Sequence, residues 1–485
     1  MKGEDMCNIA IIDMGICLYS HVSLQFDIEV SPDGKLSKSH NMMELDSIHN
    51  MEYNHGNVCY DIIKKYAPDS SIGYLRILNK TGKGNIHQLV AALRFCYENK
   101  IGIVNLSLGS IDFHDFELLR ECVNECTSNG MIIVAAYNNS DFFTYPAALS
   151  SVIGVETDKD LFGKSYHKTD ISLLGVNIRA SSRHRIKNSV KTYITPLANS
   201  FSTPFITAQI YNFIKEKKFD SLPAALSFLI SRGFFNEENH MFHPRRVDWI
   251  RKALLVNIDK PQIIYSNYKN IITQITISED DFYAHMNLNT YLEPISKSYD
   301  TVILDLRNLK SVVIKDISEI SKNVVVLNDK FNIPLIAEKG YFMWTYSYYN
   351  EYWKRIPHTD DKNTAPIIAF TGYTDEKLIN VLKSLQDRFI SEDYNAVVIT
   401  ESQVGILFGF EIFSSYLSPL DQINNLYGLY KADVFLIEFK NIEFISEEVD
   451  IIVSEQTLKF SNFCCISGAD KYIDELYLNI VKELL

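Results

Sequence analysis

Apolar and polar residues follow two rhythms in the first third of the chain. Predominantly apolar runs with the length of a buried strand occur at residues 8–12, 72–78, 101–108 and 131–136. Between them, apolar residues recur every three or four positions, as on one face of a helix, at 58–66, 85–99 and 117–128. Strands that alternate with amphipathic helices are typical of β-α-β units. The pattern therefore predicts an α/β fold in which helices flank a parallel sheet.

The same alternation resumes after residue 261, where TVILDLRN, NVVVLND, APIIAF, NAVVIT and DVFLIEF are strand-like runs. QIIYSN and IPLIAEKG have the same character. We therefore predict four regions along the chain. They are a first domain over residues 1–232, a linker over 233–260, a small α/β domain over 261–345 and a second α/β domain over 346–485.

The stretch IIAFTGYTDEKLINVL has the form of a strand, a phosphate-binding loop and a helix. A working loop of this kind needs a second glycine and a lysine, because backbone amides and the ammonium group together bind the phosphates. Counted from Gly372, Lys377 stands at the position of the second glycine and Leu378 at that of the lysine. We therefore predict a degenerate P-loop or Rossmann-like domain, and we expect the chain to use no cofactor.

Polar residues that could do chemistry stand where the predicted elements meet. Asp13 follows the first apolar run, and Asn138 follows the fourth. His55 and Gly56 open a helical pattern, and Ser200 lies at a turn that leads into another helix. Functional residues of a parallel sheet gather at the carboxyl ends of its strands. We therefore expect these side chains to lie close together.

An aspartate, a histidine, a serine and an asparagine are the parts that acyl transfer to a serine requires. The serine hydroxyl is a weak nucleophile and needs an imidazole to take its proton. The imidazole needs a buried carboxylate, which fixes its tautomer and stabilises its charged form. The oxyanion needs preorganised donors, such as a side-chain amide and a backbone N–H. Asp13, His55, Ser200 and Asn138, with the Ser200 amide, would supply each of these groups.

Six segments in one order give the chain a resemblance to the subtilisin-like serine proteases. They are IAIIDMG, HGNVCYDII, IVNLSLGS, GMIIVAAYNNS, TYPAAL and NSFSTPF, and they span about residues 8–215. The order of aspartate, histidine and serine along the chain is that of subtilisin. The resemblance implies a parallel sheet flanked by helices, a triad of Asp13, His55 and Ser200, and an oxyanion site at Asn138.

The resemblance also implies which segments hold the substrate. Ser107, Leu108 and Gly109, together with residues 135–138, would form the walls of the pocket for the residue before the scissile bond. The family has a glycine where this chain has Tyr137. We predict that an inward-pointing phenol excludes large side chains by overpacking and selects Gly, Ala or Ser. The alternative is that Tyr137 turns to solvent and leaves the pocket open.

Four other positions depart from the family motifs, at Met14, Asn57, Ala198 and Asn199. None of these departures removes a catalytic side chain, but together they allow for a slow or inactive enzyme. If Tyr137 shifts the backbone, Asn139 replaces Asn138 as the oxyanion donor. The alternative function is therefore a pseudoprotease that binds peptides as a scaffold in a peptide-modification system.

Composition and charge limit the kinds of partner and the compartment that we expect for the chain. The 485 residues carry a formal net charge of −13, which disfavours nucleic acid and anionic membranes because both attract basic surfaces. The apolar start is interrupted by Asp13 and has no basic flank, so it predicts a buried strand and neither a signal peptide nor a membrane span. Only twelve residues precede Asp13, so we expect no folding prodomain. The eight cysteines form no CxxC pair and are expected to be reduced thiols in the cytoplasm.

Three other histidines deserve comparison with His55. His240 and His243 suggest a metal site, but no cysteine or carboxylate cluster completes it, so no metal is predicted. His49 has no following glycine or helical pattern and is expected in a loop.

We therefore predict a cytoplasmic serine endopeptidase that processes a peptide or protein precursor, for instance by removing a leader. The second half is weakly similar to a P-loop-like domain of clostridial peptide-maturation proteins, which fits such a role. General protein turnover is a further alternative. The sequence does not indicate an oligomeric state.

Overall fold

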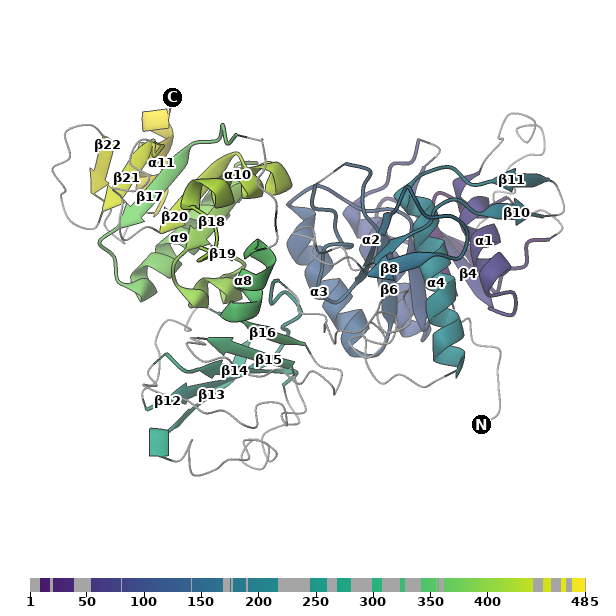
Figure 1. Cartoon of the computed structure of the whole chain (residues 1–485), viewed down its shortest axis with the longest axis horizontal. Coiled ribbons are helices and arrows are strands. Elements are labelled where there is room, and N and C mark those ends of the chain that lie inside the picture. The colour runs from purple at the N-terminus through teal and green to yellow at the C-terminus, as the bar shows by residue number, and fades with distance from the viewer. Residues whose placement is uncertain are drawn as a thin grey trace. The chain divides into compact units, whose positions relative to one another are not determined.

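The computed structural model describes residues 9–17, 21–38, 54–79, 81–140, 142–168, 175, 178–188, 191–216, 245–259, 268–280, 299–307, 323–327, 342–354, 356, 362–438, 448–454, 464–467 and 473–484. QIIYSN, IPLIAEKG, His49, His240 and His243 lie outside these residues. The chain divides into two compact units, Met1–Phe242 and His243–Leu485. Figure 1 shows the strands and helices of both units, and each unit is described by itself.

A parallel sheet forms the centre of the first unit. Among its described residues, nine strands follow the order β3-β2-β4-β1-β5-β6-β7-β9-β8, in which the β2–β3 and β8–β9 pairs are antiparallel. The strands are β1 (Ile9–Asp13), β2 (Asp27–Val30), β3 (Leu36–Lys38), β4 (Ile72–Arg76), β5 (Ile103–Leu106), β6 (Ile132–Ala136), β7 (Ile153–Thr157), β8 (Tyr166–Lys168) and β9 (Ile178–Ala180). A separate antiparallel pair joins β10 (Arg185–Lys187) and β11 (Thr192–Ile194). Every residue of the central strands β1, β4, β5 and β6 is buried, as expected for strands covered on both faces.

Helices flank this sheet, with α1 packed on α4 and α2 packed on α3 (Figure 1). Their bounds are His55–Tyr66 for α1, Ile86–Glu98 for α2, Asp115–Ser128 for α3 and Asn199–Glu216 for α4. The first helix begins at His55 because the side chain of Asn54 accepts a hydrogen bond from the Asn57 N–H and so caps the first turn. Asn85 and Gln88 form a reciprocal capping box at the start of α2.

The prediction of an α/β fold with a parallel sheet is confirmed. The apolar runs of the first third coincide with β1, β4, β5 and β6, and the helical patterns with α1, α2 and α3. The β2–β3 hairpin has no such signal, because β3 is three residues long and fully exposed. Helix α4 begins at Asn199, so Pro204 lies inside it, one turn after Ser200.

The second unit contains two parallel sheets within its described residues. The five-stranded sheet has the order β13-β12-β14-β15-β16, with β12 (Ala253–Ile258), β13 (Ile271–Ile277), β14 (Thr301–Asp305), β15 (Asn323–Leu327) and β16 (Met343–Thr345). The fully buried strand β12 lies inside the stretch 233–260 for which the sequence predicted a linker. The boundary between the units falls at residues 242 and 243, ten residues after the predicted end of the first domain.

The six-stranded sheet has the order β19-β18-β20-β17-β21-β22. Its strands are β17 (Ile367–Thr371), β18 (Ala396–Thr400), β19 (Glu411–Ile412), β20 (Val434–Glu438), β21 (Ile451–Ser454) and β22 (Cys464–Ser467). The accompanying helices are α8 (Tyr346–Lys354), α9 (Asp375–Ile390), α10 (Pro419–Tyr430), α11 (Ile473–Leu484) and the 3-10 turn η5 (Gln403–Phe408). Helix α9 carries Asp375 and Glu376 in its first turn. Carboxylates at a helix N-terminus repel phosphate, so α9 gives the predicted phosphate loop no support.

A buried ion pair joins the start of the second unit to its six-stranded sheet. The Arg245 Nη1 group lies 2.6 Å from Glu411 Oε2, and the two side chains are 5% and 3% exposed. The Tyr349 hydroxyl donates to the same carboxylate oxygen at 2.9 Å, and Tyr430 donates to the other oxygen. Burial of two charges is tolerated only where each keeps its partners, so this cluster fixes how β19 packs.

Candidate active site

Asp13 and His55 meet at the carboxyl end of β1. Asp13 is the last residue of that strand and is fully buried, while the His55 side chain is 26% exposed. The His55 Nδ1 atom lies 2.9 Å from Asp13 Oδ1 and 2.8 Å from Oδ2. A carboxylate can only accept, so Nδ1 carries the proton and Nε2 keeps a free lone pair.

The Tyr74 hydroxyl binds the turn after β1 and lies close to the first turn of α1. The Tyr74 hydroxyl donates to the Gly15 carbonyl at 3.1 Å and accepts from the Gly15 N–H at 3.3 Å. A Cβ atom added to Gly56 would lie 2.1 Å from both this hydroxyl and the Gly15 carbonyl oxygen. The glycine after His55 is therefore required by close approach, which explains why a His-Gly pair opens the helix.

The pKa of His55 lies above its usual value of 6.5. Burial is the largest single influence and by itself lowers this pKa. The negative charge of Asp13 and its hydrogen bond to Nδ1 act in the opposite direction and together outweigh burial. The carboxylate therefore stabilises the imidazolium form, which a general base must adopt during catalysis.

Ser200 is the second residue of α4 and lies in its first turn. Its neighbour Phe201 packs its ring 5.2 Å from the His55 ring. Pro204 has no N–H, so it cannot make the helical hydrogen bond to the Ser200 carbonyl four residues earlier. That carbonyl instead accepts from the Ser107 hydroxyl at 2.8 Å. The proline thus allows the segment after β5 to bind the backbone of Ser200.

The buried thiol of Cys59 lies close to groups on three other segments of the chain. Cys59 on α1 lies with its sulfur 3.8 Å from Asp13 Oδ2, 3.4 Å from the Ser107 hydroxyl and 3.8 Å from the Ser200 carbonyl oxygen. Burial, and next the charge of Asp13, raise the pKa of Cys59 well above 9.0, so the sulfur keeps its proton. The sequence suggested only a core thiol here, because the helical pattern places Cys59 among apolar residues. Nothing in that pattern shows that Asp13 and Ser200 lie opposite.

Asp13, His55 and Cys59 also have potential metal-ligand atoms within 4.8 Å of one another, a grouping found within the part of the chain that the structure describes. The proton on His55 Nδ1 is already bound by Asp13, and Cys59 is a protonated thiol. A metal would have to displace both protons, so we infer no metal at this position.

The two candidate oxyanion residues differ in what their amides contact. Asn138 is half-buried, and its Oδ1 accepts from the Ser140 N–H at 2.7 Å while its Nδ2 lies 3.5 Å from the Phe142 carbonyl oxygen. Asn139 is exposed, and its Oδ1 accepts from the Asn199 N–H at 3.3 Å. The amide of Asn138 is thus engaged inside its own loop, and the amide of Asn139 lies beside the residue before Ser200.

The substrate segments lie side by side, but Tyr137 does not take the expected place. Its ring lies against Gly154 and Gly175, whose added Cβ atoms would meet ring carbon Cε2 at 2.7 Å and the hydroxyl at 3.3 Å. The nearest atom to a Cβ at Gly109 is the Thr144 methyl group, at 2.5 Å. Ser107 and Leu108 directly precede this glycine in the chain. Tyr137 is 4% exposed, so it does not turn to solvent, and its ring packs on Gly154 and Gly175.

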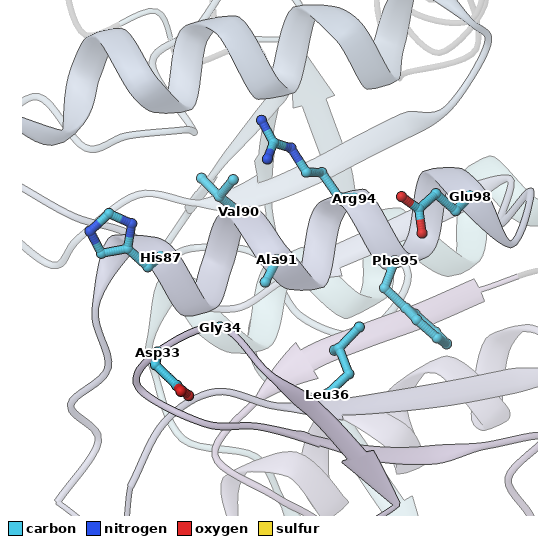
Figure 2. A pocket seen from close by; sticks show the side chains of 9 residues that line it. All are labelled: Asp33, Gly34, Leu36, His87, Val90, Ala91, Arg94, Phe95 and Glu98. Carbon is cyan, nitrogen blue, oxygen red and sulfur yellow. The ribbon is translucent and has the colours of Figure 1, made fainter.

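A separate hollow of about 440 Å³ lies elsewhere on the first unit (Figure 2). The β2–β3 turn at Gly34 and one side of α2, with Ala91 and Phe95, line it. Asp13, His55 and Ser200 are not among the lining residues. The hollow is therefore distinct from the candidate active site.

No protein-family model matches the chain. The minor extracellular protease Epr of Bacillus subtilis is 27% identical over 159 residues, which are 31% of this chain and 23% of that protein. Subtilisin Savinase of Lederbergia lenta is 28% identical over 147 residues, which are 29% of this chain and 52% of that protein. About 30% of the chain is homologous to subtilisin-like serine proteases. The chain spans 23% and 52% of the length of these two curated relatives.

Two solved structures are similar to part of the chain. A cold-adapted subtilisin-like serine proteinase has a TM-score of 0.36 and 17% identity, over 46% of this chain and 81% of that chain. A lanthipeptide protease has a TM-score of 0.32 and 13% identity, over 45% of this chain and 77% of that chain. No helix within the described ranges combines the length and the apolar character that crossing a bilayer requires.

Proposed function

We propose that the chain is a serine endopeptidase of the subtilisin type, with Asp13, His55 and Ser200 as its triad. The observation that carries this proposal is the pairing of His55 Nδ1 with the fully buried Asp13 carboxylate, at 2.8 Å, beside the first turn of α4. A histidine that was only a surface residue would not need a buried carboxylate as its hydrogen-bond partner. The homology to serine proteases supports the same assignment.

In this mechanism each residue of the triad has a distinct role. His55 Nε2 takes the proton of the Ser200 hydroxyl as its oxygen attacks the scissile carbonyl carbon. Asp13 holds the ring in the required tautomer and stabilises the imidazolium. His55 then passes the proton to the leaving amine, and water hydrolyses the acyl-enzyme by the same steps in reverse order.

Two donors are available for the oxyanion. The Ser200 N–H belongs to the first turn of α4, where backbone N–H groups have no partner inside the helix. For the second donor we propose Asn139 in place of Asn138, because the Asn139 amide lies next to Asn199 at the start of this helix. The Nδ2 group of Asn139 would then donate to the developing negative charge.

A fluorophosphonate probe tests the proposal, because it reacts covalently with a serine that an adjacent base activates. We expect labelling of the full-length protein at Ser200, shown by peptide mapping, and its loss in Ser200→Ala and His55→Ala. Ser202→Ala is the matched control: Ser202 lies two residues further along α4, is fully buried and bonds to Thr157. Labelling should survive that change. Absence of labelling in the wild-type protein would favour the scaffold function.

We further propose that the substrate is a peptide or protein precursor and that the reaction is specific processing, such as leader removal, in the cytoplasm. For such processing we expect a small residue before the scissile bond. A peptide-library profile should show cleavage confined to sequences with Gly, Ala or Ser at this position. Broad cleavage, including after Phe or Leu, would instead indicate general turnover.

A further inference from the structure

Asn199, the residue before Ser200, makes hydrogen bonds to two different segments. Its Oδ1 accepts from the Thr157 N–H at the end of β7, at 2.8 Å, and its Nδ2 donates to the Asn138 carbonyl at 2.6 Å. Its backbone N–H donates to Asn139 Oδ1 at 3.3 Å. Asn199 is 7% exposed, so water does not compete for these contacts.

We infer that Asn199 is a positioning residue, which holds the 138–139 loop at the distance from Ser200 that oxyanion binding requires. The inference rests on the proposed function and adds to it a residue that does not itself touch the substrate. An amide can accept and donate at once, so one side chain fixes both β7 and the loop. An alanine at this position could make neither side-chain contact.

The arrangement also fixes the orientation of the Asn139 amide. Because Asn139 Oδ1 is bound by the Asn199 N–H, its Nδ2 group must point away from that N–H. The Asn138 carbonyl is bound by Asn199 at the same time, so the peptide unit between the two asparagines cannot rotate freely. Oxyanion donors act without reorganisation only when they are held in this way.

Loss of this support should act on turnover and not on substrate binding. A donor displaced by about 1 Å costs on the order of 10²-fold in rate. We therefore expect Asn199→Ala to lower kcat by about 10- to 100-fold, with KM changed by less than about threefold, since the oxyanion exists only after attack. The pKa seen in the acid limb of the rate profile should not move, because Asp13 and His55 remain paired.

A double-mutant cycle separates positioning from general destabilisation. If Asn199 acts through Asn139, the Asn139→Ala/Asn199→Ala double variant should be no slower than Asn139→Ala alone. Losses in kcat that multiply in the double variant would overturn the inference. Ser202→Ala is the matched control: it also removes two buried hydrogen bonds of α4, to Thr157 and Ala180, but none to the 138–139 loop. In the Asn139→Ala/Ser202→Ala double variant, the fold-losses in kcat of the two single changes should multiply.

Amide hydrogen exchange gives a readout that does not require activity. In Asn199→Ala the Thr157 N–H loses its acceptor. The peptide that contains Thr157 and the peptide that contains residues 138–139 should therefore both exchange faster than in wild type. Ser202→Ala should leave the 138–139 peptides unchanged. Unchanged exchange in Asn199→Ala would overturn the inference even in an active enzyme. Faster exchange in a protein that does not hydrolyse peptides would support the positioning contacts and reject the proposed function.

Discussion

Peptide hydrolysis by Ser200→Ala or His55→Ala protein is expected to fall about 10⁶-fold, the size of the loss when the serine or histidine of a subtilisin triad is removed. Asp13→Asn should cost about 10⁴-fold, because an asparagine can donate to Nδ1 and so favour the wrong tautomer of His55. Steady-state kcat/KM with the peptide found by library screening measures each loss.

The pH dependence of kcat/KM should reflect the pairing of Asp13 with His55. As pH falls through the pKa of His55, Nε2 gains a proton and can no longer act as a base. This pKa lies above 6.5, so the acid limb of kcat/KM in the wild-type protein should have its midpoint above 6.5. In Asp13→Asn the charge that raises the pKa is gone and burial remains. The His55 ring resonance, identified by its absence in His55→Ala, should then titrate below 6.5.

Asp61→Asn provides the matched control for Asp13→Asn. Asp61 is also a nearly buried carboxylate on the inner side of α1, and its Oδ1 lies 3.1 Å from His21 Nε2. Its other oxygen accepts from Tyr193 at 3.0 Å. We expect this change to lower stability but to leave kcat/KM within about tenfold, since Asp61 does not contact His55. Equal losses in the two variants would contradict a specific role for Asp13.

Glu411→Gln should destabilise the second unit by about 3–5 kcal/mol, because it leaves the Arg245 charge buried without its counter-ion. Burial by itself lowers the pKa of Arg245, and the charge of Glu411 is the first influence that raises it again. The three tryptophans of the chain, Trp249, Trp344 and Trp353, all belong to this unit. Urea unfolding of the full chain followed by tryptophan fluorescence therefore measures the loss directly.

An exposed ion pair in the same unit is the comparison for that change. Arg388 Nη1 lies 2.5 Å from Glu392 Oε1, with the side chains 30% and 48% exposed. Glu392→Gln should cost far less stability than Glu411→Gln, since water replaces much of the lost interaction. A Glu411→Gln protein as stable as Glu392→Gln would show that Arg245 finds solvent or another partner.

Much of the fold could be predicted because the central strands are buried on both faces. An all-apolar run such as β1 or β6 leaves little choice but a covered parallel strand. Two strands were not predicted, each for its own reason. The run of β12 was assigned to a linker because polar and charged residues precede it, and β3 has no buried residue at all. Strand β3 is formed by backbone pairing with β2, which leaves no apolar pattern in the sequence.

In the candidate site, too, some residues could be predicted from the sequence and others could not. Asp13 and His55 could be predicted because a strand end and a helix start are visible in the sequence, and the structure brings both side chains into contact. The contribution of Tyr74 could not be predicted, because a tyrosine in a strand is common and its partner Gly15 lies 59 positions away. Asn199 was seen only as a departure from a motif. Its side-chain contacts with the segments of Asn138 and Thr157 depend on the folded chain.

The contact of Gly56 with Gly15 and Tyr74 has a consequence for how such a chain can diverge. Two atoms occupy the space of a Cβ at Gly56, the Tyr74 hydroxyl oxygen and the Gly15 carbonyl oxygen, each at 2.1 Å. A smaller residue at position 74 removes the first obstacle and leaves the second, which is backbone and cannot mutate away. Descendants of this sequence can therefore lose the tyrosine and keep the glycine. Replacement of the glycine is closed to them whether or not the tyrosine has changed.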